Sequence, residues 1–228
     1  LRWYTALFNN DQIIESALLS LKIAATSATF ATILGTMAGL ALTQMGRYRG
    51  RFIFTGLIAA PLVMPEVITG LSLLLMFVSL QELIGWPMSR GAGTITIAHI
   101  TFSMAYVAVI VQSRLSSMDQ SLQEAAMDLG GRPMQVAFDI TLPLIAPSML
   151  SGWLLAFTLS LDDLVIASFT SGAGASTLPM VIFSKIKLGV TPDVNALATL
   201  IIGTVSIGIV IASWMMFRQA KRHSIIND

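Results

Sequence analysis

The stretch Glu124–Pro143, EAAMDLGGRPMQVAFDITLP, is the longest polar interruption between strongly apolar segments of this chain. Its first half has the residues of a short helix, and Asp119 can cap the start of that helix. Gly130 can take the left-handed conformation that ends a helix, and Pro133 can occupy the first turn of a new one. The stretch therefore predicts a short helix, a sharp turn and a second helix.

Small side chains suit this short helix to contact with another protein. Ala125 and Ala126 leave a flat surface, and Glu124 and Asp128 flank it on neighbouring turns. The same spacing also fits an ordinary helical hairpin that links two membrane spans. Spacing alone leaves both interpretations open.

The composition is that of an integral membrane protein. Hydrophobic residues make up 55% of the chain, charged residues make up 11%, and the mean hydropathy is +0.79. Soluble domains have roughly 45–50% apolar and 25% charged residues. The net charge of +1 argues against a nucleic-acid partner, because such a surface needs clustered excess Lys and Arg. The chain has no cysteine, which excludes disulfides, zinc-thiolate sites and cysteine nucleophiles.

Apolar segments long enough to cross a bilayer predict an all-α protein with five spans. These spans cover about residues 13–42, 52–80, 94–111, 144–169 and 196–217. Gly35 and Gly39 form a small-xxx-small pair in the first span, which predicts close packing against a neighbouring helix. Pro61 and Pro65 interrupt the second span near its middle, and Glu66 lies at the interruption.

Basic residues in the connections predict the orientation of the chain. The segments assigned to the cytoplasm hold Arg47, Arg49, Arg51, Arg114, Arg132, Arg218, Lys221 and Arg222. Those assigned to the outside hold Arg2, Arg90, Lys185 and Lys187. The segment 119–143 and the C-terminus are therefore expected inside. Five spans then place Leu1 outside, and a start at Leu rather than Met predicts a sixth helix upstream.

The motif EAA, three residues, G, nine residues, I, one residue, LP runs without a gap from Glu124 to Pro143. It resembles, position by position, the EAA loop of the permease subunits of binding-protein-dependent ABC importers. The stretches PLVMPEVITGLSLLLMF (61–77) and SGWLLAFTLSLDDLVIASF (151–169) look like the polyamine branch of these permeases. The nearest likeness is to an inner-membrane subunit of bacterial putrescine importers.

The resemblance implies that residues 1–228 form a single type I ABC importer transmembrane domain in the bacterial inner membrane. It also implies a second permease as heterodimer partner, a cytoplasmic ATPase dimer that binds ATP and Mg, and a periplasmic polyamine-binding protein. The ATPase would grip the short helix, so the coupling residues implied are Glu124, Ala125, Ala126, Asp128 and Gly130. Importers of amino acids, sulfate or iron remain alternatives, as does a channel or receptor that does not pump.

No motif in the chain indicates an enzyme or a bound cofactor. Gly172-Ala173-Gly174 lacks the Lys-Ser/Thr of a phosphate loop, and neither an HExxH motif nor a G-x-S-x-G elbow occurs. His99 has no neighbouring ligand at metal spacing, so we expect a hydrogen-bonded intramembrane residue and not a metal site.

Charged and aromatic residues within the spans are the candidates for a polar substrate pathway. A carboxylate deep in a span costs about 2.5–3.5 kcal/mol, so each needs either a hydrogen-bonding partner or a functional reason. Asp162 and Asp163 point about 100° apart on a helix, which predicts that one faces the pathway and the other is structural. Aromatic faces can attract ammonium groups, although packing is the alternative. The candidates are Glu66, Tyr106, Trp153, Phe157, Asp162 and Asp163.

Overall fold

The computed structural model describes residues 10–46, 48–119 and 121–189, together with residues 195 and 199. The predicted last span lies outside this part of the chain except for Thr199. The chain divides into two compact units, residues 16–180 and residues 1–15 with 181–228. The regular structure in the described residues is helical, as the all-α prediction requires.

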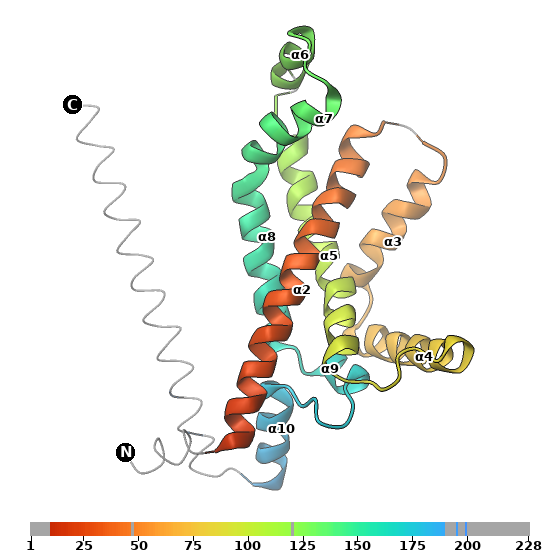
Figure 1. Ribbon diagram of the computed structural model, residues 1–228, viewed down its shortest axis with the longest axis vertical. Coiled ribbons are helices and arrows are strands. Elements are labelled where there is room, and N and C mark those ends of the chain that lie inside the picture. Colours follow the sequence, from red (N-terminus) through yellow and green to blue (C-terminus); the bar gives the residue numbers. More distant parts are fainter. Residues whose placement is uncertain (1–9, 47, 120, 190–194, 196–198, 200–228) are drawn as a thin grey trace, which may run out of the picture. The chain divides into compact units, whose positions relative to one another are not determined.

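The helices follow one another along the chain with short connections (Figure 1). In chain order they are α2 (Asp11–Gln44), α3 (Arg51–Val63), α4 (Glu66–Ile84), α5 (Ala92–Ser116), α6 (Ser121–Asp128), α7 (Pro133–Val136), the π-helical turn η1 (Ala137–Thr141), α8 (Leu142–Asp162), α9 (Val165–Thr170) and α10 (Leu178–Leu188). Four helical stretches in the described part are long and apolar enough to cross a membrane: Asp11–Gln44, Glu66–Ile84, Ala92–Ser116 and Pro133–Asp162.

Helices α2, α5 and α8 meet at Val107, which is fully buried. A Cβ atom added at Gly35 of α2 would lie 2.7 Å from the Val107 Cβ, and one added at Gly152 of α8 would lie 3.2 Å from the Val107 Cγ1. One turn along α2, a Cβ at Gly39 would lie 3.0 Å from the Val111 Cγ1. The close packing predicted at Gly35 and Gly39 is therefore confirmed, and α5 is the neighbour.

The second predicted span is two helices, α3 and α4. Met64 has an extended backbone (φ −81°, ψ 137°), because the proline that follows it disfavours the helical conformation. The break therefore falls at Pro65, whereas Pro61 lies inside α3. In Figure 1, α4 runs across the direction of α5 instead of continuing α3.

The fourth predicted span is also not one continuous helix, which corrects the prediction. Helix α8 ends at Asp162, Asp163 is extended (φ −65°, ψ 126°), and α9 begins at Val165. Pro147 is the sixth residue of α8, and the helical path already starts at Pro133. Asp163 ends α8 and supports the start of α9, as its hydrogen bonds show below.

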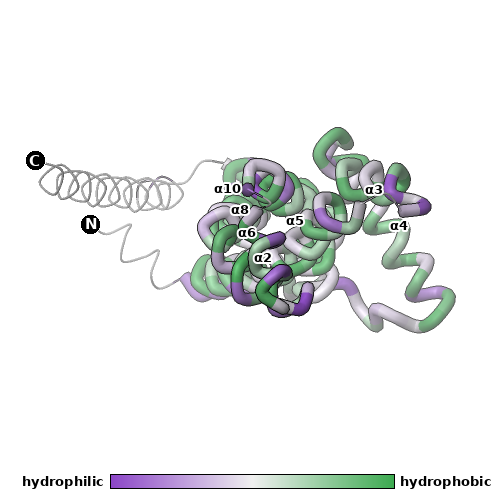
Figure 2. The backbone as a smooth tube through the Cα atoms, turned by 90° about the horizontal axis from the view of Figure 1, so that it is seen from above, coloured by the Kyte–Doolittle hydropathy of each residue, from purple (hydrophilic) through white to green (hydrophobic). Residues whose placement is uncertain are grey.

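Large apolar side chains cover the outside of the 16–180 unit as well as its core. Figure 2 shows many hydrophobic residues along its helices. Exposed examples on α3 and α4 are Phe52, Ile53, Leu57, Val63, Val67 and Leu75. Apolar surface this extensive is typical of helices that face lipid or a partner protein.

Helix α10 (Leu178–Leu188) mixes apolar side chains with Lys185 and Lys187. In this helix the Lys187 ammonium lies 4.7 Å from the centre of the Phe183 ring. Both side chains are exposed and lie four residues apart on the same face of α10.

Candidate functional site

The short helix α6 starts at a carboxylate cap. The Asp119 Oδ1 accepts a hydrogen bond of 3.0 Å from the backbone N–H of Ser121, which confirms the predicted cap. The backbone and side-chain hydrogen bonds from Ser121 hold the pKa of Asp119 below its ordinary value. Since the folded-state pKa is lowered, this stabilisation is present above the unfolded pKa and is lost as the pH falls through the folded value.

The turn after α6 depends on its two glycines. Gly130 has φ +89°, and its N–H donates to the Met127 carbonyl at 2.9 Å. No atom lies within 4 Å of an added Cβ at Gly130, so the left-handed backbone, and not lack of space, favours glycine there. Gly131 donates to the Ala126 carbonyl at 3.0 Å. Pro133 then starts the next helix, which confirms the predicted helix, turn and helix.

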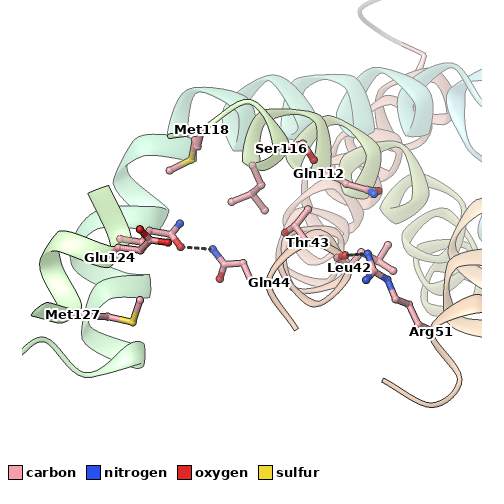
Figure 3. Close-up of a pocket in the computed structure, with 11 residues that line it drawn as sticks. Leu42, Thr43, Gln44, Arg51, Gln112, Ser116, Met118, Glu124 and Met127 are labelled. Carbon is pink, nitrogen blue, oxygen red and sulfur yellow. Dashed lines mark hydrogen bonds between the residues drawn. The ribbon is translucent and has the colours of Figure 1, made fainter. Parts of the chain in front are cut away.

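A cavity of about 500 Å³ separates α6 from the ends of α2 and α5 (Figure 3). Glu124 and Met127 reach towards it from α6. Across the cavity, the Gln44 Nε2 lies 3.4 Å from the Gln123 Oε1. The remaining lining residues are Leu42, Thr43, Arg51, Gln112, Leu115, Ser116 and Met118. The motif gave no sign of this cavity, because its other walls come from helices about 10 to 80 residues away in the chain.

Arg51 is already engaged at this cavity. Its guanidinium donates to the carbonyl oxygens of Leu42 and Gly46, each at 2.7 Å. These carbonyls lie at the C-terminal end of α2, where a positive charge is favourable. Arg51 therefore closes the turn between α2 and α3.

The opposite side of α6 is apolar and exposed. Leu122 is 50% exposed and Leu129, directly after the helix, is 90% exposed, with Ala125 between them. Of the five coupling residues predicted, Ala125, Asp128 and Gly130 lie exposed. Glu124, also exposed, lines the cavity, and Ala126 is half-buried and accepts the hydrogen bond from Gly131. Leu122 and Leu129 are not among the predicted residues, because the motif draws attention to its small and acidic residues.

A buried polar cluster joins four helices at the break between α8 and α9. The His99 Nδ1 lies 2.6 Å from the Ser160 Oγ, and the His99 Nε2 lies 3.1 Å from the Asp163 Oδ2. The Ser27 Oγ on α2 lies 3.0 Å from the same Ser160 hydroxyl. His99 is 2% exposed with both ring nitrogens bonded, which confirms the prediction of a hydrogen-bonded intramembrane residue.

The two adjacent aspartates have different surroundings. The Asp163 side chain is 9% exposed and also accepts from the backbone N–H groups of Ile166 (3.2 Å) and Ala167 (2.7 Å). Asp162, the last residue of α8, is exposed. Glu66, the first residue of α4, is exposed as well.

The aromatic candidates lie in two separate clusters. Tyr106 packs against Phe102, with ring centres 5.3 Å apart, beside residues of α4 and α9. Trp153 and Phe157 stack at 5.2 Å within the cluster of α2, α5 and α8, and the Trp153 indole donates to the Thr29 hydroxyl at 3.1 Å. The structure therefore does not bring all six candidate pathway residues into one site. In the described part of the chain, no group of three or more His, Cys, Asp and Glu could hold a metal ion.

Apolar helices that expose apolar side chains, joined by a polar helical turn, are typical of a multi-pass membrane protein. The chain belongs to the family of binding-protein-dependent transport system inner membrane components, which it matches over residues 31–224. It is thus a multi-pass permease subunit of the ABC importers, and the EAA resemblance is confirmed.

Its relatives include transport permeases of known name. The chain is 58% identical to the putrescine transport system permease protein PotI of Escherichia coli (strain K12), covering 97% of this chain and 79% of that protein. It is 42% identical to the spermidine/putrescine transport system permease protein PotC of Haemophilus influenzae, covering 95% of this chain and 81% of that protein.

Solved structures confirm the predicted fold of a type I ABC importer transmembrane domain. A bacterial ABC transporter involved in alginate import matches with a TM-score of 0.64 and 19% identity, covering 87% of this chain and 67% of that chain. The MetNI methionine ABC transporter matches with a TM-score of 0.62 and 21% identity, covering 86% of this chain and 90% of that chain. At these identities the likeness concerns the fold alone.

Proposed function

We propose that this permease imports polyamines such as putrescine or spermidine. Its relatives over almost the whole chain are named as putrescine and spermidine/putrescine permeases. It would form half of the pathway, with a second permease as the other half. A periplasmic polyamine-binding protein would deliver the substrate, and a separate cytoplasmic ATPase pair would bind ATP and Mg.

The exposed apolar face of α6, formed by Leu122, Ala125 and Leu129, is the observation that carries the coupling role. Leu129, which is 90% exposed, forms with Leu122 and Ala125 an apolar patch on a polar segment outside the spans, and such a patch supports contact with a partner protein. We assign that partner to the ATPase, with Asp128 and Gly130 at the edge of the contact, Glu124 facing the cavity of its own subunit and Ala126 closing the turn after α6.

The same segment can transmit motion to the far end of the bundle. Helical structure continues from Pro133, just after the Gly130 turn, to Asp162, over 30 residues. At 1.5 Å per residue this is about 45 Å, longer than the thickness of the hydrocarbon core. A displacement of α6 would therefore act on the α8 end that carries Asp162.

Among the aspartates, we assign Asp162 to the substrate pathway and Asp163 to a structural role. Asp163 accepts three hydrogen bonds, whereas Asp162 is exposed at the end of a span. An exposed carboxylate that faced lipid would cost about 2.5–3.5 kcal/mol, so we place Asp162, like Glu66, on a polar path or partner surface. A dication needs such carboxylate partners to replace its lost water.

The aromatic candidates divide in the same way. Tyr106 packs beside α4 and α9. Helix α4 starts at Glu66, and α9 starts two residues after Asp163. Because it lies beside these two helices, we retain Tyr106 as a pathway residue. Trp153 and Phe157 pack with α2 and α5, and we assign them to packing.

The arginines at one end of the unit suggest its orientation. Arg49, Arg51, Arg114 and Arg132 flank the α6 end, so we place this end in the cytoplasm. By the same rule, the basic residues Arg218, Lys221 and Arg222 of the sequence place the C-terminus there.

Uptake of labelled putrescine by cells that express the chain with its partner subunits tests this function. We expect saturable, ATP-dependent uptake, and Asp162→Asn should reduce it about tenfold, the effect of losing one interaction with a charged group. Asp162→Glu, which keeps the charge, is the matched control. Uptake of an amino acid, sulfate or iron with no polyamine uptake would refute the proposal.

A further inference from the structure

The buried cluster at the α8–α9 break contains a histidine, His99, to which the proposed function assigns no role. We infer that His99 is a positioning residue: through Asp163 it holds the break in the form that exposes Asp162. This inference rests on the proposed function, because Asp162 is there assigned to the substrate pathway.

The hydrogen bonds of the cluster form one complete chain of donors. Asp163 as a carboxylate can only accept, so the His99 Nε2 carries the proton that the bond to Oδ2 requires. In the neutral imidazole the Nδ1 is then an acceptor, and the Ser160 hydroxyl donates to it over 2.6 Å. Ser27 in turn donates to Ser160. Every group in this chain has a partner, which fixes the tautomer and the ring orientation of His99.

Asp163 uses its remaining capacity to start α9. Its carboxylate accepts the N–H groups of Ile166 and Ala167 that a continuous helix would bond to backbone carbonyls. Of the described hydrogen bonds to this carboxylate, two come from the backbone of α9 and one comes from a side chain on another helix, that of His99. The imidazole therefore attaches the start of α9 to α5, which is the most buried of the candidate spans in the described chain.

The break decides what lies beside Asp162. In a continuous helix, Val165 and Ile166 would be neighbours of Asp162 at the i+3 and i+4 positions. In the structure, Ile166 is instead fully buried with Leu73 and Phe77 of α4. The chain thus turns an apolar side chain away from Asp162 and leaves the carboxylate open at the end of α8.

Two amide variants separate the two bonds of His99. Gln can place an amide N–H near the position of the imidazole Nε2 and keep the bond to Asp163. Asn reaches only the Nδ1 position and keeps a bond to Ser160. If His99 acts through Asp163, His99→Gln should restore what His99→Asn loses, whereas a residue that only fills space should show no such difference.

Thiol labelling measures the exposure of residue 162 without any assumption about the substrate. The chain has no cysteine, so Asp162→Cys introduces one thiol into it, and the transporter without this substitution gives the background labelling. We expect its labelling by a polar maleimide to slow about tenfold with His99→Asn, the size expected for one lost charged hydrogen bond, and to stay near the parent rate with His99→Gln. Ser89→Cys, on an exposed loop, is the control whose labelling neither variant should change.

Transport kinetics provide the second measurement. His99→Asn should raise the KM for putrescine about tenfold with a similar maximal rate, and it should add nothing in an Asp162→Asn background, because coupled residues are not additive. If His99→Asn does not assemble, Asp163→Asn, which weakens the same contact, should slow labelling of residue 162 to the same extent.

Equal labelling in the Asn and Gln variants, or unchanged labelling in Asp163→Asn, would overturn the positioning role. A wild-type transporter that ignores polyamines but shows the labelling difference would refute the proposed substrate and leave the positioning role standing.

Discussion

At Val107 a single side chain makes contact with glycines from two other helices, and this leaves no room for a larger residue. We expect Gly35→Val to lower the free energy of unfolding by about 1–3 kcal/mol, because its Cβ would lie 2.7 Å from the Val107 Cβ and 2.8 Å from the Met104 carbonyl oxygen. Thermal unfolding of the purified protein in detergent measures this. Gly56→Ala is the control: it lies in α3 with no atom within 4 Å of the added Cβ, so stability should be unchanged or slightly higher.

Single-residue chemistry could be predicted from the sequence only where it is local. Gly130 was predicted as a helix terminator from its place between a helical pattern and Pro133, and its φ of +89° agrees. The hydrogen-bonded state of His99 was also predicted. In contrast, the 100° angle between Asp162 and Asp163 shows only that they differ. Which one is buried depends on His99, 64 residues away in the chain.

On the scale of secondary-structure elements, the turn after α6 is expected to be necessary for coupling. Gly130→Val should impair it, because a left-handed conformation costs a residue with a Cβ roughly 1–2 kcal/mol, and a β-branched residue suits it least. Gly130→Asn is the matched control, since Asn adopts this conformation more readily. Co-purification of the ATPase and substrate-stimulated ATP hydrolysis are the measurements. Equal loss in both variants would indicate that the contact requires the absence of a side chain and not the turn geometry.

The break between α8 and α9 was not predicted because no proline or glycine marks it. The local sequence LSLDDLVIAS is apolar enough to continue a helix. One signal was available: Asp is a preferred capping residue, and Asp163 stands three residues before Ile166, whose N–H it accepts. Proline did mark the other break, although at Pro65 and not at Pro61.

For the whole molecule, family and fold follow from a motif and from hydropathy, whereas the sites between helices do not. The cavity behind α6 is lined by the ends of α2 and α5 and by Arg51, and no local pattern in these segments indicates that they meet. Their meeting is a consequence of tertiary packing at Gly35, Gly39 and Val107. A sequence motif can therefore identify the coupling segment without showing which of its side chains face its own subunit.

The orientation of the whole subunit can be tested at the two ends of α5. This helix has 25 residues, about 37 Å at 1.5 Å per residue, so its ends should lie on opposite sides of a hydrocarbon core of about 30 Å. Ser89, in the connection before α5, and Ser117, directly after it, are both exposed.

Because the chain has no cysteine, Ser89→Cys and Ser117→Cys each introduce a single thiol. In sealed cells an impermeant maleimide added outside should label the Ser89→Cys variant, and the Ser117→Cys variant only after the membrane is opened. The reverse pattern would place α6 outside and remove the proposed contact with a cytoplasmic ATPase.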